Sequence, residues 1–378
     1  MTALCIIYLA AELLILSRRV RHIPLRICVT GTRGKSSVTR LIAACLREAG
    51  FAVLAKTTGS KPVIIFPDGS EREIKRRGNP TILEGKKILA EAEKLRVKAL
   101  VSEMMSIHPE CSFVESVQMF KPHVFVITNV RLDHLEQMGR SKEEIARCFA
   151  FSIPENTAVF IGGGGYFPLF DEAARKRNSK VIKVDKESFR ENFEPQKNFL
   201  PLEFEENIRL ALAVAEFLGV EKETALRGLK KAIPDFGSLK VWIRDFGSPP
   251  RKIFLVSAFA ANDPESTRAV LTSVREKISI EKRKVIALLN LRKDRGDRTV
   301  QWMEALKAGA FPEFEKIFLN GDHSYVLKRK LKKTLKAELF ILKNKAPQRI
   351  MEEISEKAEG DEVLVGIGNM GGIGKELV

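Results

Sequence analysis

A glycine-rich turn between a predicted strand and a predicted helix constrains this chain more than any other feature. Residues 26–30 form a short apolar run, and the turn begins directly after it. Its residues are Gly31, Thr32, Arg33, Gly34, Lys35, Ser36 and Ser37. Apolar residues then recur at helical spacing over residues 36–49. This order predicts an α/β fold in which the turn joins a buried strand to the helix that follows.

The residue types in this turn suit phosphate binding. Backbone N–H groups of such a turn cradle phosphates, a lysine reaches the terminal phosphates, and the next hydroxyl binds Mg²⁺. The longer form of the motif has a glycine where this chain has Val29, so the form present here is G-x-x-G-K-S. We predict a phosphate-binding loop. The alternative is a helix N-cap with an incidental lysine.

Apolar runs alternate with helical patterns along the rest of the chain. Runs such as 124–128 and 158–161 contain no polar residue before their ends, which is typical of parallel strands buried on both faces. Breaking residues at 233–238 interrupt the alternation, which then restarts. We therefore predict a phosphate-loop, parallel-sheet ATPase domain and a smaller Rossmann-like α/β domain, preceded by a short hydrophobic helix. The predicted boundaries are 1–22, 23–236 and 237–378.

Polar residues stand where two further predicted strands end. Glu103 ends the strand that starts at residue 99, and Asn129 follows the strand at 124–128, with Asp133 and His134 close behind. Because ligands of an open parallel sheet lie at the carboxyl ends of its strands, we expect Glu103 and His134 to lie beside the turn. A carboxylate and an imidazole beside bound phosphates suit metal-assisted phosphoryl chemistry.

Together, these motifs resemble those of a known superfamily. The motifs GTRGKSS, SE and TNVRLDHLEQMG resemble the Mur ligases, which include folylpolyglutamate synthases. In finer detail, the chain resembles the catalytic subunits of poly-γ-glutamate synthases through TGTRGKSSVTRLI, KTTG, VSEMMSIHPE, FAANDPEST, NLRKDRGDRT and GIGNMGG. The resemblance implies an ATP-dependent ligase that activates a carboxylate as an acyl phosphate and couples it to an amine. The substrate implied is glutamate, added to an anionic polyglutamate acceptor for a capsule.

The resemblance also implies roles for site residues. Ser36 and Glu103 are expected to hold one Mg²⁺, and His134 to serve a second metal or the phosphates. Lys35 is expected to bridge the β- and γ-phosphates of ATP. Lys35, Glu103 and His134 are thus the expected catalytic residues.

Two more residues are implied to contact the nucleotide. Asn207 falls where the superfamily has a nucleotide-contacting asparagine, and Lys240 falls near its phosphate-contacting arginine. The superfamily's ribose-binding motif is missing from the second domain, where Asn262 or Asp263 could substitute.

The metal site also departs from the superfamily pattern. Mur ligases carry a carbamylated lysine fifteen residues after the metal-site histidine, and this chain has Phe149 there. Metal binding at His134 must then differ, or rely on Asp133 and water.

The net charge of the chain indicates which classes of partner it can bind. Lys and Arg number 64 against 48 Asp and Glu, a net charge of +16, so the surface attracts anions. Aromatic residues make up only 7% and no aromatic-basic strand is present, so no nucleic acid is expected. A charged loop after the predicted strand 285–289 could contact phosphate or be solvated. Its candidate residues are Arg292, Asp294 and Arg295.

The N-terminus is strongly apolar. Residues 3–16 carry a single charge, Glu12, and Arg18, Arg19 and Arg21 follow. The run is shorter than the roughly 20 residues of a spanning helix. We expect a membrane anchor that keeps the catalytic body on the cytoplasmic face, with membrane partner subunits. The alternative is a buried first helix.

Three other functions remain open from the sequence. A folylpolyglutamate-type or cyanophycin-type ligase is the nearest alternative. A membrane-anchored P-loop ATPase without ligase activity would be expected to have a strand ending in Asp, whereas the strand ends here carry Glu103 and Asn129. A basic nucleic-acid-binding ATPase is disfavoured by the lack of aromatic residues that could stack on bases.

Overall fold

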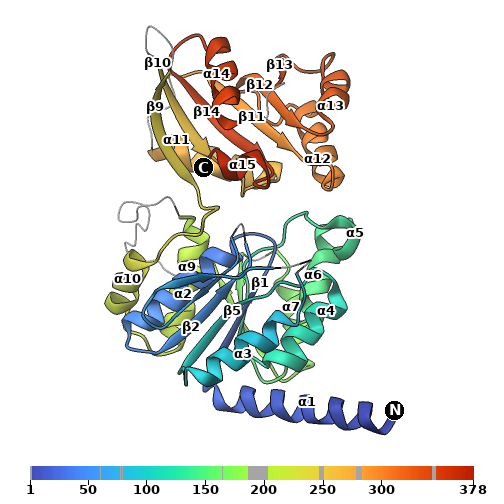
Figure 1. The fold of residues 1–378 in the computed structure, drawn as a ribbon, viewed down its shortest axis with the longest axis vertical. Coiled ribbons are helices and arrows are strands. Elements are labelled where there is room, and N and C mark those ends of the chain that lie inside the picture. The colour runs from blue at the N-terminus through green and yellow to red at the C-terminus, as the bar shows by residue number, and fades with distance from the viewer. Residues whose placement is uncertain are drawn as a thin grey trace. The chain divides into compact units, whose positions relative to one another are not determined.

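The chain divides into two compact units, Met1–Asp235 and Phe236–Val378, each built on its own sheet (Figure 1). This computed structural model describes residues 2–59, 61–76, 78, 80–163, 165–185, 203–246, 251–277, 283–342 and 346–378.

The sheet of the first unit has eight strands in the order β4-β3-β2-β5-β1-β6-β7-β8. The strands are β1 Leu25–Thr30, β2 Val53–Thr57, β3 Val63–Ile65, β4 Glu71–Glu73, β5 Ala99–Glu103, β6 Val124–Ile127, β7 Ala158–Gly162 and β8 Lys180–Val184. Six of them run parallel, which confirms the predicted parallel sheet, although β8 was not among the predicted strands. The β3–β4 hairpin at one edge pairs antiparallel and was not predicted, because strands of three residues are too short to show a period.

Helices cover both faces of this sheet (Figure 1). The described helices of this unit are α1 Thr2–His22, α2 Lys35–Glu48, α3 Glu84–Lys94, α4 Pro109–Phe113, the π-helix η1 Val114–Phe120, α5 Leu135–Met138, α6 Lys142–Phe151, α7 Phe167–Arg175, α9 Glu205–Phe217 and α10 Lys222–Lys231. Helices α2, α9 and α10 pack on one face, and α3, η1, α6 and α7 pack on the other.

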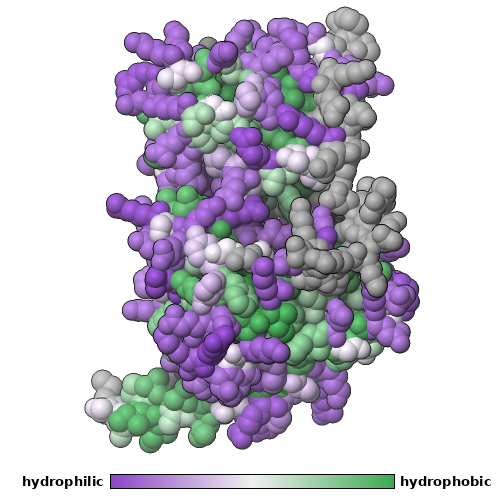
Figure 2. Space-filling view, turned by 180° about the vertical axis from the view of Figure 1, so that it is seen from behind, coloured by the Kyte–Doolittle hydropathy of each residue, from purple (hydrophilic) through white to green (hydrophobic). Residues whose placement is uncertain are grey.

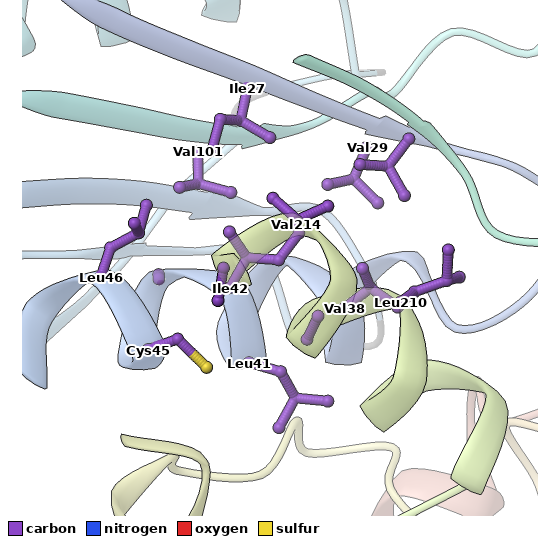
Figure 3. Close-up of a cluster of buried hydrophobic side chains, with 14 of the residues drawn as sticks. Ile27, Val29, Val38, Leu41, Ile42, Cys45, Leu46, Val101, Leu210 and Val214 are labelled. Carbon is purple, nitrogen blue, oxygen red and sulfur yellow. The ribbon is translucent and has the colours of Figure 1, made fainter. Parts of the chain in front are cut away.

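Strand β1 shows why these runs are apolar throughout. Ile27 and Val29 face α2 and α9, whereas Cys28 faces the opposite helical layer. Figure 3 shows Ile27 and Val29 with Val38 of α2 and Val214 of α9 in one cluster. Helix α2 packs against the sheet on one side and against α9 and α10 on the other. The turn at its N-terminal end is therefore held firmly against the carboxyl edge of the sheet.

The second unit has a six-stranded sheet in the order β13-β12-β11-β14-β10-β9. Its strands are β9 Lys240–Phe246, β10 Arg251–Ser257, β11 Val285–Leu291, β12 Phe314–Gly321, β13 Glu338–Ile341 and β14 Glu362–Gly368. Its helices are α11 Pro264–Lys277, α12 Gly296–Lys307, α13 Ser324–Leu331, α14 Pro347–Lys357 and α15 Ile373–Glu376. The predicted Rossmann-like alternation is confirmed, except that the unpredicted edge strand β9 pairs antiparallel with β10.

Helix α1 is docked at one end only. Val20 is buried and Leu16 packs against the first unit, while His22 Nδ1 lies 2.8 Å from Glu93 Oε1 of α3. The N-terminal part is different: its apolar side chains are between 49% and 73% exposed. They are Leu4, Ile6, Ile7, Tyr8, Leu9, Leu13, Leu14 and Ile15, and the leucines and isoleucines among them form the green patch on this helix in Figure 2. The alternative of a buried first helix is therefore wrong.

Within the residues that the structure describes, no helix is both long enough and apolar enough to span a bilayer.

Candidate active site

Two glycines give the turn at residues 31–37 its shape. Gly31 has φ +121° and Gly34 has φ +81°, which side chains rarely allow. Space is also restricted: a Cβ on Gly31 would lie 2.1 Å from Thr128 Oγ1, and one on Gly34 would lie 2.3 Å from Asn207 Oδ1. The turn therefore fits closely between the end of β6 and the start of α9.

Asn129 holds the turn rather than projecting from it. The Arg33 N–H donates to Asn129 Oδ1 (3.0 Å), and Asn129 Nδ2 donates back to the Arg33 carbonyl (3.1 Å). Thr128 Oγ1 donates to the same carbonyl (2.6 Å). Asn129 was predicted as a site residue because it ends a strand. Both ends of its amide bind the loop backbone, so its role here is to shape the loop.

Lys35 folds back over the turn. Its Nζ donates to the carbonyls of Gly31 (2.7 Å) and Thr32 (3.4 Å). Burial lowers the pKa of Lys35, while the nearby Glu103 carboxylate raises it. The charges of Arg33 and Asp133 also act on Lys35. The predicted convergence of the turn with two strand ends is thus present within this unit.

Ser36 and Glu103 meet directly. Ser36 Oγ donates to Glu103 Oε2 (2.7 Å), and the backbone N–H of Thr58 donates to the same oxygen (2.6 Å). Glu103 is only 2% exposed. Gly59 completes the enclosure, since a Cβ there would lie 2.4 Å from Ser36 Oγ. Hydroxyl and carboxylate oxygens are the donors that Mg²⁺ prefers, so this pair fits one such ion.

Asp133 and His134 form a second group beside the turn. Arg33 Nη1 lies 2.7 Å from Asp133 Oδ2, and His134 Nε2 lies 3.4 Å from the same oxygen. His134 has φ +51° and directly precedes α5. Among the described residues, no cluster of three or more His, Cys, Asp and Glu side chains could hold a metal.

Asn207 lies against the turn, and its contact with the nucleotide stays a prediction. Its Nδ2 donates to Glu203 Oε1 (2.7 Å), and its Oδ1 faces Gly34. Burial raises the pKa of Glu203, whereas its hydrogen bonds to Asn207 and Ser37 lower it. Glu203 thus links α9 to the loop, and nothing in the sequence pattern had indicated it.

Three residues that were predicted to contact the nucleotide lie in the second unit. Lys240 begins β9, and its Nζ lies 4.9 Å from the centre of the Phe236 ring. Asn262 accepts a hydrogen bond from Trp302 Nε1 through its backbone carbonyl (3.1 Å). Asp263 caps α11 by accepting from the Ser266 N–H (2.8 Å) and hydroxyl (2.6 Å), so its carboxylate is already engaged.

The charged loop after β11 consists of two arginine–aspartate pairs. Arg292 Nε lies 2.9 Å from Asp294 Oδ1, and Arg295 Nε lies 3.2 Å from Asp297 Oδ1. The Arg292 guanidinium holds the pKa of Asp294 below its ordinary value. Each guanidinium is therefore fixed by a carboxylate two residues further on, and contact of this loop with phosphate stays a prediction.

Comparison with known proteins bears on both units. Residues 29–228 match the Mur ligase middle domain, and residues 243–378 match the poly-gamma-glutamate synthase CapB C-terminal domain. The PGA synthase CapB of Bacillus subtilis is 32% identical over 96% of this chain and 91% of its own length. The chain belongs to the CapB family of Mur ligases.

Other relatives are more partial or more distant. The capsule biosynthesis protein CapB of Bacillus anthracis is 37% identical over 80% of this chain, which spans 64% of that relative's length. A folylpolyglutamate synthase/dihydrofolate synthase of Yersinia pestis, solved with AMPPNP and an Mn ion, shares the fold. It has a TM-score of 0.68 and 15% identity, over 96% of this chain and 90% of that one.

In this CapB-family chain the position of the superfamily's carbamylated lysine is apolar. Phe149 belongs to α6, is 4% exposed and lies in the same apolar cluster as Ile145 and Ile153. The sequence had shown this departure, but not that Arg33 and Asp133 form an ion pair. Thr58 and Gly59 were also missed as site residues. The KTTG motif at 56–59 was the available signal, since it ends a strand next to Glu103.

Proposed function

We propose that this chain is an ATP-dependent amide ligase that adds glutamate in poly-γ-glutamate synthesis. The observation that carries the proposal is the Ser36–Glu103 pair at the end of the 31–37 turn. It lies in a chain whose two units match a Mur ligase domain and a poly-γ-glutamate synthase domain. Mur ligases are ATP-dependent amide-forming enzymes, and the relatives' names supply the proposed substrate.

The proposed reaction has two steps. A substrate carboxylate oxygen attacks the γ-phosphorus of ATP, which gives an acyl phosphate and releases ADP. An amino group then attacks the acyl carbon, and the tetrahedral intermediate expels phosphate as the amide forms. The N–H groups of the turn and the Lys35 ammonium would stabilise charge on the transferred phosphoryl group. For this, Lys35 would exchange its present contacts with the Gly31 and Thr32 carbonyls for phosphate oxygens.

We further propose that Ser36 and Glu103 hold Mg²⁺. When bound there, the ion would neutralise charge on the β- and γ-phosphates. The hydroxyl and carboxylate oxygens are already 2.7 Å apart, and a hydrogen bond from the Thr58 N–H holds the carboxylate in place.

The acceptor we propose is an anionic polyglutamate chain. The support is the net charge of +16, because an excess of lysine and arginine attracts a polyanion. Membrane partner subunits would receive the product, and elongation would depend on them.

The function is tested by measuring ADP release from the full chain with a panel of acceptors. We expect ADP release to require glutamate or its oligomers. The apparent affinity for oligomers should fall at least roughly tenfold between 50 and 200 mM salt, because exposed charges are screened. Stimulation by a pteroate or a peptide, with no response to glutamate oligomers, would keep the ligase and reject the substrate.

We also propose that α1 holds the enzyme at the cytoplasmic face of the membrane. Apolar side chains exposed along its N-terminal part, followed by Arg18, Arg19 and Arg21, suit a helix that lies in an anionic lipid surface.

Paired substitutions test this role of α1. Leu13→Glu with Leu14→Glu alters two side chains that are 67% and 70% exposed, so the fold should be unaffected. We expect co-sedimentation with phosphatidylglycerol-containing vesicles to fall at least roughly tenfold, since each buried leucine contributes about 1.5–3 kcal/mol. Tyr325→Glu, at a side chain that is 74% exposed in the second unit, is the control. Undiminished binding by the double variant would reject the proposal.

A further inference from the structure

The resemblance to Mur ligases implies that His134 serves a second metal or the phosphates, and the residues around it do not fit a metal. The position expected to supply a carbamylated lysine is Phe149. This phenyl ring is 4% exposed and belongs to an apolar cluster on α6. Neither an oxygen nor a nitrogen donor can come from that position.

Asp133 does not supply the missing ligand either. Its side chain is only 3% exposed, and Oδ2 already lies 2.7 Å from Arg33 Nη1. His134 Nε2 approaches the same oxygen at 3.4 Å. A dication bound to this carboxylate would stand next to a guanidinium within a buried site, where like charges repel strongly.

The backbone of Arg33 is fixed in place. Asn129 binds both its N–H and its carbonyl, and Thr128 Oγ1 donates to the same carbonyl. The guanidinium stays at the turn, because Arg33 Nη1 donates to the Thr32 carbonyl (3.4 Å). Lys35 Nζ donates to the same carbonyl (3.4 Å), so the two positive charges lie close together.

We propose that this chain works with a single divalent cation at Ser36 and Glu103, and that Arg33 supplies the second positive charge. A guanidinium has five N–H donors in one plane, so it can bind the Asp133 carboxylate and a phosphoryl oxygen together. Asp133 is then a positioning residue that aims Arg33, and it is not a metal ligand. This inference rests on the proposed ligase function, because it assigns the charge that faces the transferred phosphoryl group.

Counting bound metal tests the inference independently of turnover. The full chain is equilibrated with Mn²⁺ and AMPPNP, and bound metal and nucleotide are measured together. We expect one Mn²⁺ per bound nucleotide, and an electron paramagnetic resonance spectrum without coupling between two ions. Two ions per nucleotide would overturn the inference. Absence of nucleotide binding would instead reject the proposed function, and this inference with it.

Three variants extend the test. Asp133→Asn should keep one Mn²⁺ per nucleotide, whereas a metal-ligating Asp133 would lose an ion on this change. Arg33→Met should keep the same count but lower glutamate-dependent ADP release at least roughly a hundredfold, as for other arginines that face a transferred phosphoryl group. Arg33→Lys should recover part of that loss, because it restores the charge without the planar fork. Unchanged ADP release by Arg33→Met would also overturn the inference.

Discussion

Replacing Glu103 by alanine should lower Mg²⁺-dependent ATP turnover by roughly a thousandfold or more, on the scale of losing a charge that stabilises a transferred phosphoryl group. The carboxylate accepts a hydrogen bond from Ser36 Oγ (2.7 Å), so its loss removes one of the two proposed metal ligands. Its removal also leaves the Thr58 N–H without its acceptor, which should cost about 1–3 kcal/mol of stability. The measurement is steady-state ADP release as a function of Mg²⁺ concentration.

Glu103→Gln separates charge from hydrogen bonding, because it keeps the volume and an acceptor oxygen. We expect it to fold with near wild-type thermal stability and still to lose most of its response to Mg²⁺. Glu115→Gln is the matched control. Glu115 is a fully buried acid near the same sheet edge that accepts hydrogen bonds from Ser106, and it does not contact Ser36. A Glu103→Gln protein with an unaltered Mg²⁺ response would remove Glu103 from the metal site.

Gly34→Ala should abolish nucleotide binding, whereas Gly50→Ala should not. The two glycines have nearly the same conformation, φ +81° and +86°. Around Gly50 a Cβ would meet nothing within 4 Å, whereas at Gly34 it would lie 2.3 Å from Asn207 Oδ1. Both variants carry the strain of a left-handed alanine, about 1 kcal/mol. Only Gly34→Ala must also displace Asn207 or the turn.

Isothermal titration with AMPPNP measures this difference, and thermal unfolding reports the strain that the variants share. We expect both variants to fold, with the lower unfolding midpoint in Gly34→Ala, and a loss of affinity of at least roughly a hundredfold for Gly34→Ala alone. Equal affinities in the two variants would show that the contact between the turn and Asn207 does not matter for the nucleotide.

Features that repeat along the chain could be predicted from the sequence. The parallel strands are apolar throughout because both of their faces are buried, and this left a clear signal in the residue pattern. The Ser36–Glu103 pair could also be expected, since both residues stand where strands meet one sheet edge. Strand β9 was missed because, as an edge strand, it carries exposed polar side chains such as Arg244 and Asp245 and resembles a linker.

Contacts between distant residues could not be predicted in the same way. Arg33 and Asp133 are 100 residues apart, and no spacing rule connects them. Asn129 illustrates a different limit. A polar residue at a strand end suggested a ligand contact, but whether its amide faces a ligand or the backbone of a neighbouring loop depends on how that loop is folded.

The packing of α10 onto α2 has a consequence for synthesis of the chain on the ribosome. Cys45 Sγ of α2 donates to the Ala225 carbonyl of α10, across 180 residues. The two helices pack so closely that a Cβ on Gly228 would lie 2.6 Å from the Ala44 carbonyl oxygen. At 5–20 residues per second, the intervening chain takes about 10–35 s to translate. Throughout that time the nascent helix α2 lacks one of its covering layers, so its packing is complete only after α10 has emerged.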